Sequence, residues 1–178
     1  VRAIATLQPQ EPIVGHQYIA GLDWGKQNDY TVLSVFDLTT NRQVYLDRFN
    51  KIDWALQRER VISVWQKYKP TTIVAERNSI GDPNIEALQR DGVPMQPFTT
   101  TNATKADIIE RLSLGIERKE ITLLDNAVQT AELEAYEMER TPSGLVKYGA
   151  PQGLHDDCVM ATALAWYGAS SGGIGVYI

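Results

Sequence analysis

Acidic side chains occupy positions at which a fold can bring distant residues together. Asp23 and Glu76 each follow a short apolar run that is typical of a buried strand. Asp156 and Asp157 stand at the start of an alanine-rich stretch with helical character. In open α/β sheets, strand ends and helix starts converge at one edge, and functional sites tend to lie there. The sequence therefore predicts a cluster of carboxylates at one edge of a sheet.

Such a cluster suggests metal chemistry. Crowded carboxylates repel one another unless divalent cations bind between them. Carboxylate oxygens suit Mg²⁺ or Mn²⁺, and two such ions can activate a water and stabilise the leaving oxygen in phosphodiester hydrolysis. An aspartate at a strand end is, however, more often a turn or cap residue, and Asp156 could simply cap its helix. On spacing alone, both interpretations stay open.

The elements that must position these acids alternate in type. Apolar or alternating runs predict strands at 18–23, 31–36, 42–49, 71–76 and 121–124, and a hairpin through 145–148. Helical spacing predicts helices over 54–68, 84–90, 105–118, 127–140 and 155–166, the first of them capped by Asp53. A three-strand meander followed by a crossover helix implies a mixed sheet.

The composition is that of one globular domain. The 178 residues are 43% hydrophobic and 22% charged, so the chain is long enough to bury a core without disulfides. Residues 1–16 predict a linker, 17–169 the folded domain and 170–178 a flexible tail. A chain that begins with such a linker, and without Met, is expected to be a fragment of a longer protein. Its single cysteine, Cys158, fits a reducing compartment.

The charge balance restricts the class of partner. Lys and Arg number 17 against 22 Asp and Glu, which gives a formal net charge of −5 and excludes an all-over cationic surface. No apolar run approaches the roughly 18 residues of a membrane span, so no membrane partner is expected. A nucleic-acid partner requires a local basic strip, or metal ions that offset the acids.

Three motifs follow one another in the chain. They are Tyr18-Ile19-Ala20-Gly21-Leu22-Asp23-Trp24-Gly25, then Ile73-Val74-Ala75-Glu76, then His155-Asp156-Asp157 before a helix of small apolar residues. In this order and at these intervals, over roughly residues 17–168, they resemble the nuclease domain of large terminase subunits, the DNA-packaging motors of tailed bacteriophages. The resemblance implies an α/β fold of the RNase H-like type, a mixed β-sheet with helices on both faces.

The resemblance also implies an activity. It is that of a Mg²⁺- or Mn²⁺-dependent endonuclease that cleaves double-stranded concatemeric viral DNA during packaging, through two metal ions and with little sequence specificity. The implied partners are an N-terminal ATPase domain, the portal and the small terminase subunit, in the host cytoplasm. No Gly-x-x-x-x-Gly-Lys-Ser/Thr phosphate loop occurs in this sequence, so ATP hydrolysis by that route is not expected of it.

Carried over by position, Asp23, Glu76 and one of the pair Asp156 and Asp157 match the metal-binding carboxylates of the family. Helical geometry favours Asp157, because it shares a face with Ala161 on the expected sheet-packing side. Asp156 lies roughly 100° around the helix and is expected to cap it or to bind an ion through water.

Contacts to DNA phosphates are expected from side chains beside the site or in the hairpin. Lys105 precedes a helix in a segment that resembles one placing a lysine near the site in the family, and the hairpin segment 141–151 matches one that approaches DNA. Each of these residues can equally be a solvated surface group. The DNA-binding or supporting candidates are Lys26, Arg77, Lys105, Arg111, Lys147, Tyr148 and His155.

Two other functions stay open at this level. Another RNase H-like nuclease, such as a junction resolvase or a transposase core, also uses acids at strand ends, and a resolvase would act as a dimer on branched DNA. A non-catalytic assembly module would keep the fold, dock to the portal or motor, and neither bind Mg²⁺ or Mn²⁺ nor cut DNA.

Overall fold

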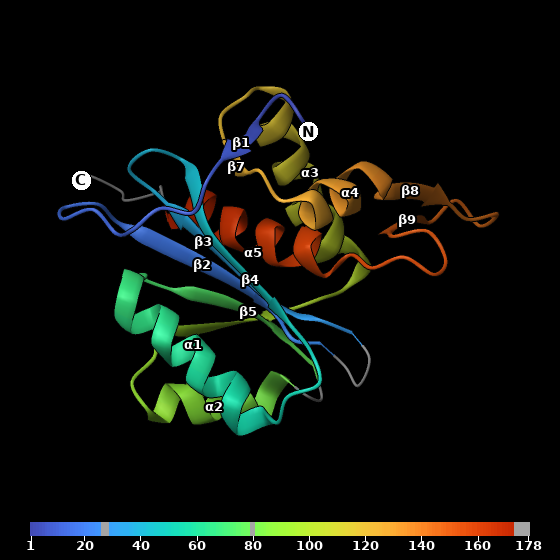
Figure 1. Ribbon diagram of the computed structural model, residues 1–178. Coiled ribbons are helices and arrows are strands. Elements are labelled where there is room, and N and C mark those ends of the chain that lie inside the picture. The colour runs from blue at the N-terminus through green and yellow to red at the C-terminus, as the bar shows by residue number, and fades with distance from the viewer. Residues whose placement is uncertain (26–28, 79–80, 173–178) are drawn as a thin grey trace, which may run out of the picture.

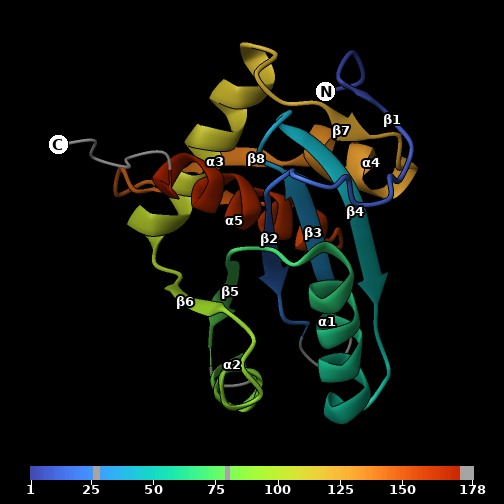
Figure 2. The ribbon, with the colours of Figure 1, turned by 90° about the vertical axis from the view of Figure 1, so that its left-hand side faces the viewer.

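A five-stranded mixed sheet forms the centre of the computed structural model, which describes residues 1–25, 29–78 and 81–172. Its strand order is β4-β3-β2-β5-β6, visible across the sheet in Figure 2. The strands are β2 (Tyr18–Asp23), β3 (Thr31–Asp37), β4 (Arg42–Phe49), β5 (Ile73–Arg77) and β6 (Met95–Thr99). The meander β2-β3-β4 is antiparallel, whereas β5 and β6 run parallel to β2, which confirms the mixed sheet.

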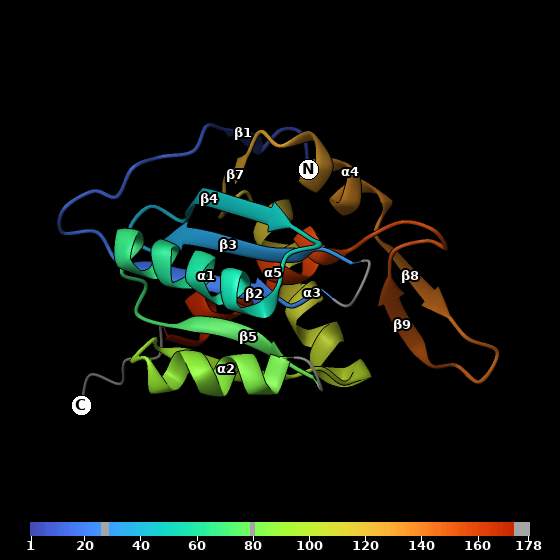
Figure 3. The ribbon, with the colours of Figure 1, turned by 60° about the horizontal axis from the view of Figure 1, so that its bottom comes forward.

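Helices cover both faces of this sheet, as Figures 1 and 3 show. One face packs against α1 (Trp54–Tyr68) and α2 (Gly81–Arg90), and the other against α3 (Asn102–Glu117) and α5 (Asp157–Gly172). Because apolar layers lie above and below, every residue of β2 and β3 is buried. Asp53 caps α1 as predicted: its Oδ1 accepts the N–H of Leu56 at 2.9 Å.

Small residues let α5 lie directly on β2. A Cβ atom added to Gly21 would stand 2.1 Å from the main-chain oxygen of Ala161 and 2.3 Å from the nitrogen of Ala165. This close approach fixes the start of α5 beside the end of β2. The predicted helix 155–166 thus begins at Asp157 and continues to Gly172, so residues 170–172 are helical and not part of a flexible tail. Residues 173–178 lie outside the described chain.

The sequence-based prediction is wrong for the segment that follows α4 (Ala127–Ala135). The predicted helix 127–140 ends at 135, and 137–140 instead form β8 (Glu137–Arg140), which pairs with β9 (Val146–Gly149). The Glu-Met-Glu-Arg sequence of β8 has good helix propensity, and pairing with β9 overrides it. The resulting hairpin projects from the body of the molecule beside α3 and α4 (Figure 3). Strand β6, which contains Pro97, was not predicted either.

The first residues take part in the fold. Within the segment 1–16, predicted as a linker, Ala5–Leu7 forms β1 and pairs in parallel with β7 (Leu123–Leu124), while Ile4 is buried. Tertiary pairing thus supplies a structure that the local sequence does not signal. Across the described ranges, no helix has the length and apolar character needed to cross a bilayer.

Candidate metal-binding active site

The predicted acids converge on one small cavity. Asp23, Glu76, Asp156 and Asp157 line a space of about 170 Å³, called here the acidic cavity. Its other lining residues are Trp24, Asp29, Thr100, Lys105 and Met160. The parallel register explains the convergence, since Leu22 pairs with Ala75, and Asp23 and Glu76 are the next residues on two adjacent strands. The packing of α5 on β2 then delivers the other two carboxylates to the same end of the sheet.

Asp23 lies deepest in this cavity. It is 7% exposed, and its pKa is raised well above the ordinary value of 3.8. Burial is the largest cause, followed by the charge of Glu76 and a hydrogen bond with it, and then by the charges of Asp157 and Asp156. All of these influences disfavour the ionised form, so the charge of Asp23 has no adequate compensation from the protein alone.

Asp157 is held by the main chain. It is 8% exposed, its Oδ2 accepts the N–H of Tyr30 at 3.3 Å, and Nδ1 of His155 lies 3.6 Å from the same oxygen. Its pKa is raised to about 6, mainly by burial and further by Glu132 and Asp29, while the Tyr30 N–H and His155 oppose the rise.

Asp156 has a different setting. Its main-chain oxygen accepts the N–H of Met160 at 2.9 Å, as in the first turn of a helix, and its carboxylate is half-buried. Its Oδ2 lies 3.3 Å from Nζ of Lys105, which comes from α3 on the far side of the cavity. The carboxylate therefore faces a cation from another helix, and it lines the cavity together with Asp157.

The donor set fits hard divalent cations. Four carboxylates offer oxygen ligands of the kind that Mg²⁺ and Mn²⁺ prefer. Trp24 and Thr100 also line the cavity, and the Nε1 of the former and the Oγ1 of the latter are buried without a hydrogen-bond partner among the described residues. Within the described ranges, no three His, Cys, Asp or Glu side chains already stand in metal-coordination geometry, and Oδ2 of Asp156 is paired with Nζ of Lys105.

Some predicted supporting residues lie at this site and others do not. Lys105 lines the cavity, and His155, with a side chain 43% exposed, stands between Asp157 and Asp29, 3.9 Å from an oxygen of the latter. Arg77 follows Glu76 on β5 but pairs with Asp82 at 3.1 Å and does not line the cavity. Lys26 lies outside the described residues.

The remaining candidates lie away from the cavity. Lys147 and Tyr148 are on β9, where the hydroxyl of Tyr148 donates to Glu110 on α3 at 3.2 Å. Arg111 pairs with Asp107 one helical turn away at 3.0 Å. The structure therefore places the hairpin near α3, but brings neither of its two candidate residues into the acidic cavity.

Sequence reasoning missed Asp29. It lines the cavity from the loop between β2 and β3, and no apolar run precedes it to mark a strand end. The only available signal was its sequence proximity to Asp23. Glu132 was also missed, because it sits in the middle of α4 among residues that read as an ordinary helix.

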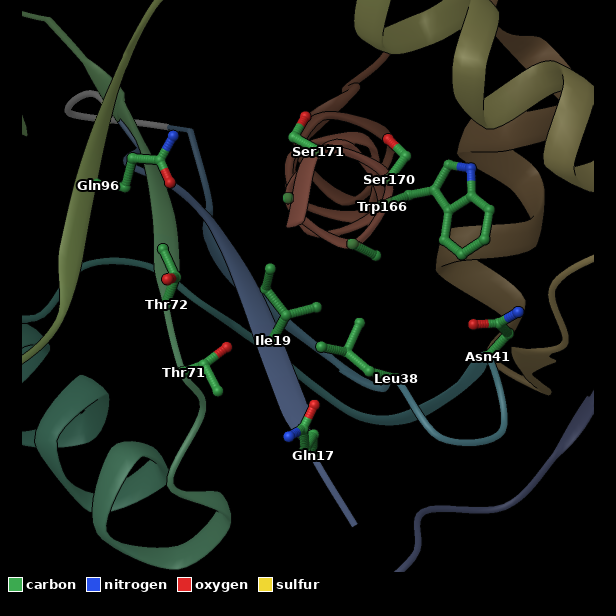
Figure 4. A pocket seen from close by; sticks show the side chains of 12 residues that line it. Gln17, Ile19, Leu38, Asn41, Thr71, Thr72, Gln96, Trp166, Ser170 and Ser171 are labelled. Atoms are coloured by element: carbon green, nitrogen blue, oxygen red, sulfur yellow. The ribbon is translucent and has the colours of Figure 1, made fainter. Parts of the chain in front are cut away.

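A larger hollow of about 750 Å³ lies elsewhere, between the sheet and the C-terminal part of α5 (Figure 4). Ile19, Leu38 and Trp166 line it together with neutral polar side chains. None of its described lining residues is ionisable, so they offer no carboxylate or imidazole for acid–base chemistry or for metal binding. The size of a cavity therefore does not identify the functional site. The ionisable side chains indicate that the smaller acidic cavity is the candidate site.

A mixed sheet of this order, with carboxylates at the ends of β2 and β5 and at the start of α5, defines an α/β domain of the RNase H-like class. The chain belongs to the family of terminase RNase H-like domains, whose family model matches residues 20–167. The resemblance seen in the sequence and the predicted fold class are thereby confirmed.

Individual relatives agree with this assignment. The chain is 33% identical over 152 residues to the large terminase subunit of Thermus virus P23-45, covering 85% of this chain and 31% of that protein. The large terminase nuclease of thermophilic phage G20c, solved with bound magnesium, superposes with a TM-score of 0.85 at 29% identity, covering 93% of each chain. The large terminase of bacteriophage HK97 shares the fold, with a TM-score of 0.70 at 13% identity over 93% of this chain and 41% of that one. The chain thus spans less than a third of the curated relative.

Proposed function

We propose that this chain is a divalent-metal-dependent endonuclease that cleaves double-stranded viral DNA during genome packaging. One observation carries the proposal: Asp23, Glu76, Asp156 and Asp157 share a cavity in which burial and mutual repulsion raise the pKa of Asp23. Side chains crowded in this way favour cation binding, because a cation relieves the repulsion. Solved relatives support the proposal, since the G20c nuclease has been crystallised with magnesium and with cobalt.

The proposed roles follow the positions of the side chains. Asp23, Glu76 and Asp157 hold two Mg²⁺ or Mn²⁺ ions, with Asp156 as a further ligand directly or through water. When bound, such ions polarise the scissile phosphate and lower the pKa of an attacking water. In this proposal, Lys105 contacts a phosphate oxygen that enters between it and Asp156, and its reach across the cavity to Asp156 supports this role.

DNA contacts outside the cavity come from exposed groups in this proposal. His155 beside Asp157, Arg77 after Glu76, and Lys147 and Tyr148 on the hairpin contact the duplex through its phosphates, so sequence preference is weak. In the full-length protein, an N-terminal ATPase domain, the portal and the small terminase subunit are the proposed partners, in the host cytoplasm. The net charge of −5 means that binding depends on these local cations and on bound metal.

Plasmid cleavage tests the proposal. The wild-type chain should nick and linearise supercoiled plasmid with Mn²⁺, and EDTA should stop the reaction. Asp23→Asn should lose cleavage while remaining folded, because it removes one ligand and leaves the shape of the cavity unchanged. Asp91→Asn, which removes the same charge from an exposed turn after α2, is the matched control and should cut as well as the wild type.

The same assay separates the alternatives. Preference for four-way junctions over linear duplex would replace the packaging nuclease by a junction resolvase. Absence of both Mn²⁺ binding and cleavage in the wild type would point to a non-catalytic assembly module. Cleavage retained by Asp23→Asn would refute the assignment of the site.

A further inference from the structure

Behind the acidic cavity, a largely buried ion pair connects β4 and α4, and the Arg48 side chain in it is 21% exposed. Glu132, on α4, is 7% exposed, and its Oε1 lies 3.5 Å from Nη2 of Arg48 on β4. We call these two residues the Arg48–Glu132 pair. Neither residue lines the acidic cavity, and neither has a role in the function proposed above.

Glu132 reaches the first turn of α5. Its Oε2 accepts the main-chain N–H of Cys158 at 2.7 Å, one residue after Asp157. The first N–H groups of a helix have no partner within that helix, and a carboxylate placed there also interacts favourably with the helix dipole. Glu132 therefore acts as a cap supplied by another helix, and it fixes the main chain that carries Asp157.

Arg48 also contacts Tyr30, whose main chain binds the carboxylate of Asp157. Its guanidinium carbon lies 3.3 Å from the centroid of the Tyr30 ring. The main-chain N–H of Tyr30 donates to Oδ2 of Asp157 at 3.3 Å. Arg48 thus contacts both Tyr30, which donates to the Asp157 carboxylate, and Glu132, which holds the main chain one residue further on.

The contacts of the pair show that charge and stacking hold it together. Oε1 of Glu132 and Nε of Arg48 are buried without a hydrogen bond among the described residues, although the two charged groups face each other at 3.5 Å. Removing one member of a buried pair leaves an uncompensated charge, and this is more damaging than removing both members.

We propose that Arg48 and Glu132 are positioning residues that hold Asp157 in its orientation toward the acidic cavity. The expected effect of this positioning on metal binding rests on the proposed function. The positioning itself depends only on contacts within the protein. The proposal excludes a purely electrostatic role for Arg48. A cation behind an acidic cluster weakens metal binding by repulsion, so its loss would strengthen binding unless the carboxylates also lost their alignment.

The sign of the effect of Arg48→Met is therefore diagnostic. We expect the main-chain amides of Tyr30 and Cys158 to exchange with solvent about 10-fold faster than in the wild type. We also expect a weaker affinity for Mn²⁺, measured from the increase in Tm with Mn²⁺ concentration. The concentration that gives half of the full increase should rise about 10-fold, as is typical when residues that hold metal ligands in place are removed. Arg48→Lys keeps the charge but loses the flat stacking surface, so it should affect the amide of Tyr30 more than that of Cys158.

Two further variants complete the experiment. Glu132→Gln keeps an oxygen that can accept the Cys158 N–H, and combined with Arg48→Met it should recover part of the lost Mn²⁺ affinity by removing the stranded charge. Arg60→Met is the matched control: Arg60 also pairs with a carboxylate, Asp47 at 2.6 Å, and lies 4.4 Å over the Phe49 ring, but it does not line the cavity. It should leave both readouts unchanged.

The outcomes separate this proposal from the proposed function. If Arg48→Met leaves both amides protected, or binds Mn²⁺ more tightly, the positioning role is refuted even when the wild type cuts DNA. If the amides exchange faster in a protein that neither binds Mn²⁺ nor cuts plasmid, the positioning of Asp157 stands and the nuclease function falls.

Discussion

Replacing Asp157 by asparagine should make the metal-free protein more stable while abolishing its cleavage of DNA. The fold raises the pKa of this carboxyl from 3.8 to about 6, a net effect that already includes the favourable N–H of Tyr30. At ~1.4 kcal/mol for each tenfold change in proton affinity, this corresponds to roughly 3 kcal/mol at most. Screening by solvent at the cavity mouth reduces the expected gain to about 1–2 kcal/mol.

The pH dependence follows from the direction of that shift. Because the folded protein binds this proton more tightly than the unfolded chain does, the metal-free wild type loses stability as the pH rises from 3.8 to about 6. Asp157→Asn has no such titration. The free energies of unfolding of the two proteins should therefore converge below a pH of about 4 and differ by the full amount at pH 7.

Urea unfolding in EDTA between pH 4 and pH 8 measures this difference, with Asp91→Asn as the control for loss of an exposed charge. A gain of about 1–2 kcal/mol corresponds to a rise in Tm of roughly 2–8 °C for a chain of this size. With Mn²⁺ the difference should shrink or reverse, because ligand binding to the native state stabilises only the wild type. An Asp157→Asn protein no more stable than the wild type at pH 7, or a difference independent of pH, would refute this reasoning.

Other predictions concern packing and phosphate binding. Gly21→Ala should lower the free energy of unfolding by about 3 kcal/mol or more, because the new Cβ would meet the main chain of α5. At Gly149 an added Cβ would meet no described atom within 4 Å, so Gly149→Ala should change the free energy of unfolding by less than about 0.5 kcal/mol. Equal urea midpoints for the two variants would contradict the close packing of α5 on β2. Lys105→Gln should slow plasmid cleavage and change the free energy of unfolding by less than about 1 kcal/mol, since its ion pair with Asp156 is partly exposed to solvent. Undiminished nicking by this variant would remove Lys105 from the proposed phosphate contacts.

Several features of the fold could be predicted from sequence because their signals are local. The apolar runs before Asp23 and Glu76 mark strands that are buried on both faces, and the helical spacing after Asp53 marks α1. The order of these elements indicates a mixed sheet, and the motifs identify the family. The metal-ligand roles of the acids stay predictions, although their convergence on one cavity meets the geometric requirement.

Only the tertiary structure shows which residues and segments lie next to one another. The parallel register of β2 and β5 sets Asp23 beside Glu76, and pairing with β9 turns the helix-prone segment 137–140 into a strand. Contacts between residues far apart in the chain depend on where whole elements pack, and no local period encodes them. For that reason the sequence determined which carboxylates this protein carries to the edge of its sheet, whereas only the packed structure showed how Arg48 and Glu132 lie behind Asp157.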